Sequence, residues 1–158
     1  MMFPDAAGAA PHLPPGTAGH VDHLGIAVTD LEAGVRLYRD LLGLELERIE
    51  DVPAEGVRVA MLKLDRAGGP GRLELLQPTG PGGAIAKFLA KRGPGLHHVA
   101  VAVADIEAVM AACAAAGLEL LDRTPRAGAG GRRVAFIHPR AAGGVLIELC
   151  APGPGGHA

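Results

Sequence analysis

The sequence repeats itself once, at an offset of 74 or 75 residues. The segment His20–Val28 (HVDHLGIAV) aligns with Gly95–Val103 (GLHHVAVAV), so that His98 falls on His23. Three later segments also correspond: Gly43–Glu47 with Gly117–Leu121, Gly56–Leu62 with Gly131–Ile137, and Leu73–Leu76 with Ile147–Cys150. Self-similarity at a fixed period indicates an architecture built from repeated units. Because there are only two copies, a solenoid is excluded, and we predict a tandem duplication whose halves complete one another across a pseudo-twofold axis.

The first segment of each copy has the pattern of a β-strand. Successive side chains of a strand point to opposite faces. One face carries only Leu, Ile and Val, which a helix would cover. The other carries an imidazole followed by two minimal side chains, namely His23, Gly25 and Ala27 in the first copy and His98, Ala100 and Ala102 in the second. The small side chains leave space beside each histidine, and we interpret this space as an active site.

The rest of each copy predicts a helix and three further strands. The helices, at residues 30–42 and 105–116, begin with an acidic residue that can cap the N-terminus and end before a glycine. The predicted strands are Leu44–Ile49, Val57–Leu64 and Leu73–Leu76 in the first copy and Leu118–Arg123, Arg132–His138 and Val145–Cys150 in the second. The sequence therefore predicts an α+β fold, with two tandem βαβββ modules forming a cupped mixed sheet and helices on its outer face.

A single domain is predicted over residues 20–150. Module 1 takes residues 20–78, module 2 takes residues 95–150, and residues 79–94 form a linker with a short helix. Residues 1–19 are rich in Ala, Pro and Gly without periodicity, so we expect a disordered arm, and we expect a loose tail at residues 151–158. The chain of 158 residues has the usual length of one domain.

Composition argues against two classes of partner. The formal net charge of −2 is not the basic footprint of a nucleic-acid-binding protein. No apolar run approaches the roughly 20 residues that cross a bilayer, and the first residues lack the basic and apolar regions of a secretory signal.

The two cysteines, Cys113 and Cys150, have no metal-binding or redox spacing. We therefore expect free thiols and a cytoplasmic location.

Each copy also contributes one histidine and one glutamate at equivalent positions. His23 and Glu74 are 51 residues apart, and His98 and Glu148 are 50 residues apart. A lone strand histidine is more often a structural residue. However, each glutamate lies inside an apolar strand, where an unpaired carboxylate is costly. These four residues are the predicted ligands of one divalent metal ion per chain: Co²⁺ is the first expectation, with Mn²⁺, Ni²⁺, Zn²⁺, Fe²⁺ or Mg²⁺ as alternatives.

Several other residues receive weaker assignments. The glycine-rich segment 127–131 has neither phosphate-loop nor dinucleotide-binding spacing, so we interpret it as a rim loop over the site. His97 would point to the helix side of its strand and is interpreted as structural. His138 is a minor candidate for the site, and His20 is assigned to the surface.

The duplicated plan, with its ligand order His, Glu, His, Glu, resembles the vicinal oxygen chelate superfamily, which includes glyoxalase I and the extradiol dioxygenases. Within it, three segments are similar to the methylmalonyl-CoA epimerases: Gly95–Ala100 (GLHHVA), Val134–Pro139 (VAFIHP) after a glycine pair, and Gly143–Leu149 (GGVLIEL). The resemblance covers residues 20–150. It implies a homodimer of paired modules in which each chain closes a cup around one metal ion.

The resemblance implies that (2R)- and (2S)-methylmalonyl-CoA interconvert by 1,1-proton transfer through an enolate. Glu148 is the first candidate for one base, and Glu74, Glu55 or a water is the candidate for the other face. Some family members carry Gln at the position of Glu74 and a proton-carrying Glu at the position of Val59, so this chain departs from them twice. Candidates for binding the CoA phosphates are Lys87, Lys91, Arg92, Arg126 and Arg132.

Two other functions fit the same fold. One is a glyoxalase-type lyase or isomerase that acts on a hemithioacetal. The other is a binding protein that sequesters a small drug or a metal. Members of the superfamily that only bind small molecules usually lack the metal ligands. All four predicted ligands, His23, Glu74, His98 and Glu148, are present in this chain, which favours an enzyme.

Overall fold

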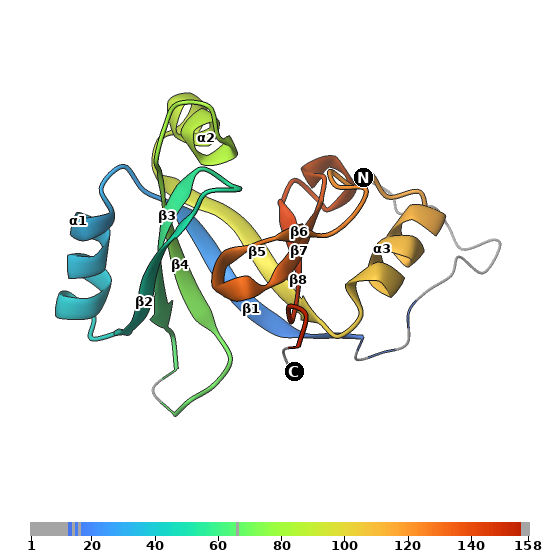
Figure 1. Cartoon of the computed structure of the whole chain (residues 1–158), viewed down its shortest axis with the longest axis horizontal. Helices are drawn as coiled ribbons and strands as arrows, with labels where there is room; N and C mark the ends of the chain where they lie inside the picture. The colour runs from blue at the N-terminus through green and yellow to red at the C-terminus, as the bar shows by residue number, and fades with distance from the viewer. Residues whose placement is uncertain (1–12, 14, 16, 66, 156–158) are drawn as a thin grey trace.

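The computed structural model describes residues 13, 15, 17–65 and 67–155, which form an eight-stranded sheet with helices packed on it (Figure 1). Residues 1–12, 14 and 16 of the predicted arm and residues 156–158 of the predicted tail lie outside the described residues. The strands are β1 (Ala18–Ala27), β2 (Glu45–Val52), β3 (Val57–Lys63), β4 (Arg72–Pro78), β5 (Gly95–Val103), β6 (Arg126–Ala127), β7 (Arg133–Ile137) and β8 (Ile147–Ala151). The helices are α1 (Leu31–Val35), α2 (Ala84–Arg92) and α3 (Ile106–Ala115), with a π-helical turn η1 (Arg36–Leu41) and 3-10 turns η2 (Ala129–Gly131) and η3 (Pro139–Ala141).

The strand order β2-β3-β4-β1-β5-β8-β7-β6 shows the duplication directly. β1 and β5, the first strands of the two copies, pair antiparallel at the centre of the sheet. Each then pairs in parallel with the last strand of its own copy, β1 with β4 and β5 with β8. The remaining neighbours are antiparallel, so the sheet is mixed. The predicted fold class, two βαβββ modules in a curled mixed sheet, is confirmed.

Helices α1 and α3 begin and pack in equivalent ways. The carboxylates of Asp30 and Asp105 each accept a hydrogen bond from a backbone N–H three residues later, at 3.0 and 2.9 Å. α1 packs Leu31 and Val35 against β3 and β4, and α3 packs Ile106 and its neighbours against β7 and β8. Burying each large aliphatic side chain stabilises the fold by about 1.5–3 kcal/mol. None of the described helices is long and apolar enough to cross a membrane.

Helix α2 packs on the other face of the sheet. Its Ile85 lies in a core cluster with Ala27 of β1, Val59 of β3 and Leu76 of β4. Leu76 is two residues from Glu74 on β4, so both side chains point to the same face. α2 therefore covers one end of the face that carries the predicted site.

The predicted strand Leu118–Arg123 is wrong. This segment makes only an isolated bridge between Leu120 and Ile137, and the short strand β6 follows it. The side chain of Asp122 accepts a hydrogen bond from the Phe136 backbone N–H at 2.8 Å. The Asp122 carboxylate thus takes the place of a backbone carbonyl that would accept this hydrogen bond in a regular β-sheet. Aspartate side chains compete with the backbone for local hydrogen bonds in this way. Pro125 further restricts the backbone before β6.

Candidate metal centre

The register of the four central strands brings the four predicted ligands to one face. Between β1 and β5, Gly25 lies opposite His98, and His23 lies opposite Ala100. In the parallel pairs, Gly25 also lies beside Glu74, and Ala100 lies beside Glu148. Each small residue is therefore flanked by one imidazole and one carboxylate. The space that the sequence predicts beside each histidine is filled in part by the other ligands.

The four side chains meet with their ligand atoms close together. The Nε2 atoms of His23 and His98 are 3.1 Å apart. Glu74 Oε2 lies 3.3 and 3.5 Å from these two nitrogens, and the Glu148 oxygens lie 3.6 and 3.2 Å from them. Donors about 2.1 Å from one metal ion are separated by about 3.0–3.4 Å in octahedral or tetrahedral geometry. The cluster therefore has the dimensions and the donor types of a divalent metal site.

All four side chains are buried. The exposed fractions are 4% for His23 and Glu74, 3% for His98 and 5% for Glu148. A compact subset, His23, His98 and Glu148, has ligand atoms that all lie within 4.8 Å of one another. Glu74 completes the set because its Oε2 contacts both imidazoles. Two anionic and two neutral donors would balance the charge of a divalent ion in this buried position.

The pKa values in the cluster are strongly shifted. Burial alone would lower the pKa of His23, but hydrogen bonds to Asp22 and Glu74 raise it to about 10. Burial alone would raise the pKa of Glu74, but hydrogen bonds from His23 and His98 lower it to about 2. Burial raises the pKa of Glu148 to about 8, with a further contribution from the charge of Glu74 against the opposing charge of His23. At neutral pH the metal-free cluster therefore holds protons on His23 and Glu148.

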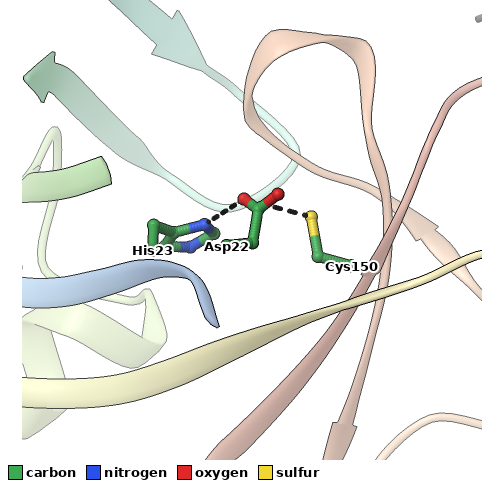
Figure 2. Close-up of side chains that lie close together, drawn as sticks. All are labelled: Asp22, His23 and Cys150. Carbon is green, nitrogen blue, oxygen red and sulfur yellow. Dashed lines mark hydrogen bonds and ion pairs between the residues drawn. The ribbon is translucent and has the colours of Figure 1, made fainter. Parts of the chain in front are cut away.

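The orientation of His23 is fixed by Asp22. His23 Nδ1 lies 2.8 Å from Asp22 Oδ1 (Figure 2). The protonated Nδ1 therefore donates to Asp22, and Nε2 faces the cluster. The other Asp22 oxygen accepts from Arg132 Nη2 at 2.8 Å. A carboxylate behind a ligating histidine sets its tautomer and increases its basicity. Sequence reasoning missed Asp22, although its position before the histidine in the first strand is visible in the sequence.

Cys150 lies on the far side of Asp22 (Figure 2). Its Sγ is 3.8 Å from Asp22 Oδ1, so Asp22, His23 and Cys150 form a second group of metal-binding residue types. Burial raises the pKa of the Cys150 thiol well above its usual range. A metal binds the thiolate form of cysteine, which the raised pKa disfavours, and Asp22 is already hydrogen-bonded to His23 and Arg132. We therefore interpret Asp22 and Cys150 as residues that lie behind His23, and not as a second metal site. Cys113 and Cys150 are free thiols, as predicted.

His98 is also held from behind, by His97. Their Nδ1 atoms are 2.9 Å apart, and the ring of His97 packs edge-on against Phe88 of α2 at 4.9 Å. Burial and the neighbouring charge of His98 lower the pKa of His97 to about 4. A neutral His97 can accept a hydrogen bond from His98 Nδ1, which leaves His98 Nε2 for the cluster. Because α2 packs on the face of the sheet that carries the cluster, the contact with Phe88 does not match the predicted helix side of the strand. The contact with His98 gives His97 a positioning role.

A cavity of about 790 Å³ lies against the cluster and is lined by His23, Glu74 and Glu148. The predicted rim loop lines it through residues 128–131, and Gly130 N–H donates to Glu50 of β2 at 2.8 Å. Among the cationic candidates, Arg132 lines this cavity, whereas Arg92 lines a smaller one of about 320 Å³. Neither cavity is lined by Lys87, Lys91, Arg126 or His138, whereas His20 lines the larger one.

We expect Gly25→Ala to weaken both the fold and the site. An added Cβ would overlap the imidazole of His98, and overpacking of this kind typically costs about 1–3 kcal/mol. Chemical denaturation and a metal titration measure the two effects. Gly80→Ala is the matched control, since a Cβ at Gly80 meets nothing within 4 Å. A Gly25→Ala protein with unchanged stability and metal affinity would contradict the packing described here.

Metal binding is expected to release about one to two protons at pH 7, because a metal replaces the protons on His23 and Glu148. The apparent affinity should therefore increase as the pH rises from 6.5 to 8.5. Calorimetric titration with Co²⁺ or Zn²⁺ in buffers of different ionisation enthalpy counts the protons. An affinity independent of pH, with no proton release, would argue against the cluster as the binding site.

The chain is similar to a known superfamily and to curated proteins of that superfamily. Residues 22–136 match the Glyoxalase/Bleomycin resistance protein/Dioxygenase superfamily. Among curated relatives, an ethylmalonyl-CoA/methylmalonyl-CoA epimerase of Cereibacter sphaeroides is 40% identical over 133 residues, which is 83% of this chain and 96% of the relative.

Solved structures agree with this match. The crystal structure of methylmalonyl-CoA epimerase from Mycobacterium tuberculosis has 39% sequence identity and a TM-score of 0.83, and the alignment covers 93% of this chain and 97% of that one. A methylmalonyl-CoA epimerase in complex with methylmalonyl-CoA and NH4+ is 40% identical with a TM-score of 0.81, over 87% of this chain and 99% of that one. The family match spans the first three residues of the cluster and most of the sheet, and the chain belongs to the Glyoxalase/Bleomycin resistance protein/Dioxygenase superfamily.

Proposed function

We propose that the protein is a metal-dependent epimerase that interconverts (2R)- and (2S)-methylmalonyl-CoA. The observation that carries the proposal is the buried cluster of His23, Glu74, His98 and Glu148. Three of these residues, His23, Glu74 and Glu148, line a cavity of about 790 Å³. The similarity to proteins named as methylmalonyl-CoA epimerases supports the choice of substrate. Methylmalonyl-CoA is thus the proposed partner, and one divalent ion per chain, Co²⁺ first, is the proposed cofactor.

The four cluster residues would hold the ion, and their chemistry fits the reaction. When bound, a divalent ion supplies a Lewis acid that stabilises negative charge developing on the thioester oxygen. Glu148 is a buried carboxylate that lines the cavity. Once a bound ion has displaced its proton, Glu148 can act as a general base that takes a proton from carbon.

Other residues of the chain would shape the cavity for the substrate. Met61 and Val134 contribute apolar surface, and Arg132 contributes a cation at the rim. Arg132 is also bound to Asp22, so part of its charge is already used. A homodimer is included in the proposal because the resemblance to the vicinal oxygen chelate superfamily implies one. The consecutive residues Leu41 and Leu42, which are 79% and 60% exposed, offer apolar surface that a second chain would cover.

Proton exchange tests the proposed function. The metal-loaded protein is incubated with methylmalonyl-CoA in D₂O, and the proton on the malonyl α-carbon is followed by NMR, with an EDTA-stripped sample as control. We expect metal-dependent exchange together with inversion. Ethylmalonyl-CoA and the glutathione hemithioacetal of methylglyoxal are tested in parallel. Turnover of the hemithioacetal without exchange of methylmalonyl-CoA would replace the proposal with a glyoxalase-type activity.

A further inference from the structure

Inversion at carbon needs proton carriers on both faces of the substrate, and, if the proposed function holds, Glu148 serves only one of them. Four other carboxylates among the described residues line the cavity: Asp22, Glu47, Glu55 and Glu74. Three of them are engaged at short distance. Asp22 binds His23 and Arg132 at 2.8 Å, Glu47 binds Arg72 at 2.9 Å, and Glu74 contacts both imidazoles of the cluster. The remaining carboxylate is Glu55.

Glu55 lies in the turn between β2 and β3, close to the cluster. Its side chain is 23% exposed, and its nearest described ion-pair partner is Arg126 Nη1, at 3.9 Å. That separation is too long for a hydrogen bond, so the carboxylate is held loosely enough to give up or accept a proton. Burial raises the pKa of Glu55, the charge of Arg126 opposes this effect, and the charges of Glu74 and His98 also act on it.

Arg126 is itself fixed by the second half of the chain. Its Nε donates to Asp122 Oδ1 at 2.6 Å, and its guanidinium lies over the ring of Phe136, 5.4 Å from the centroid. Phe136 in turn packs edge-on against His98 at 5.9 Å. The long ion pair between Glu55 and Arg126 therefore connects the β2–β3 turn of the first copy to β6 of the second copy, beside the cluster.

The side chains of β3 that pack beside Leu76 and Glu74 of β4 are apolar and cannot carry a proton. Val59 is 1% exposed and lies opposite Leu76 in the register of β3 and β4. Together with Val57 and Met61 it belongs to an apolar cluster. Glu55, in the turn at the end of this hairpin, is therefore the candidate proton carrier on this side of the cavity.

We propose that Glu55 is the second proton carrier, acting on the face of the malonyl α-carbon opposite to Glu148. In one direction Glu148 takes the proton from the α-carbon, and the electrons of the C–H bond pass into the thioester to give the enolate. Protonated Glu55 then donates its proton to the opposite face, and the enolate electrons form the new C–H bond. Glu55 ends as a carboxylate and Glu148 ends protonated, and proton exchange with water restores both.

The test starts from each pure epimer in D₂O, with the metal-loaded wild-type and Glu55→Gln proteins. We expect inversion by Glu55→Gln to fall about 10²- to 10⁴-fold. Exchange of the proton should continue near the wild-type rate for one epimer, the one whose proton faces Glu148, and should be lost for the other. Such a split between epimers would not follow from a structural role, which would slow both. Equal slowing of both epimers, or undiminished inversion, would overturn the assignment.

Two controls separate this inference from the proposed function. Asp51→Asn removes an exposed carboxylate from the same hairpin, where Asp51 pairs with Arg58, and it should exchange and invert both epimers like the wild type. Metal content is measured for every variant and should not change, because Glu55 is outside the cluster. Failure of the wild-type protein to exchange either epimer would overturn the proposed function and this inference together. A wild type that inverts beside a Glu55→Gln protein that inverts equally well would overturn this inference alone.

Discussion

Glu148→Gln is expected to lower the rate of epimerisation by about 10³-fold while the protein keeps its metal. The amide retains an oxygen at the position of the carboxylate, so a ligand atom remains, but it cannot take a proton from carbon. Glu148 is 5% exposed and lies 3.6 and 3.2 Å from the two Nε2 atoms of the cluster. The isosteric change should leave this packing intact.

The measurement is the inversion rate at saturating methylmalonyl-CoA, with metal content and thermal stability determined on the same samples. Glu32→Gln is the matched control, because the Glu32 side chain is 84% exposed and lies on α1, away from the cavity. Two results together would remove Glu148 from the proton-transfer step: full metal occupancy and an inversion rate within a few-fold of the wild type.

The repeat in the sequence accounts for most of the fold and for the residues of the cluster. Alternation along each strand indicates which side chains share a face, and the equivalence of His23 with His98 and of Glu74 with Glu148 selects four of them. Whether these four side chains come together still depends on which strands pair with one another. The order that places β1 beside β5 is a long-range arrangement, which the pseudo-twofold axis predicted only in outline.

Features that depend on single side-chain contacts could not be predicted from the sequence. Asp22 and His97 each precede a cluster histidine, and alternation alone assigns both to the opposite face of their strands. In the structure their side chains reach the Nδ1 atoms of His23 and His98. Similarly, the predicted strand Leu118–Arg123 fails because the Asp122 carboxylate takes a backbone hydrogen bond of β7. Such competition between side chain and backbone leaves no periodic signal.

His98→Ala is expected to weaken metal binding by more than about 100-fold, because losing even a partner behind a ligand costs about 10- to 100-fold. Metal at 100 times its dissociation constant stabilises the wild type by about 2.7 kcal/mol. At the same concentration the variant should show almost no metal-dependent shift in Tm. Calorimetric titration and thermal denaturation, with and without metal, measure both effects.

The space left by His98 provides a further check on the same variant. Because Gly25 has no Cβ beneath the imidazole, free imidazole in solution should enter the gap and restore part of the metal binding. His138→Ala is the matched control, since His138 is bonded to the Arg140 backbone N–H and lies outside the residues that line the cavity. If His98→Ala bound metal as tightly as His138→Ala, the ion would have to be held elsewhere, and the assignment of the cluster as the metal centre would fail.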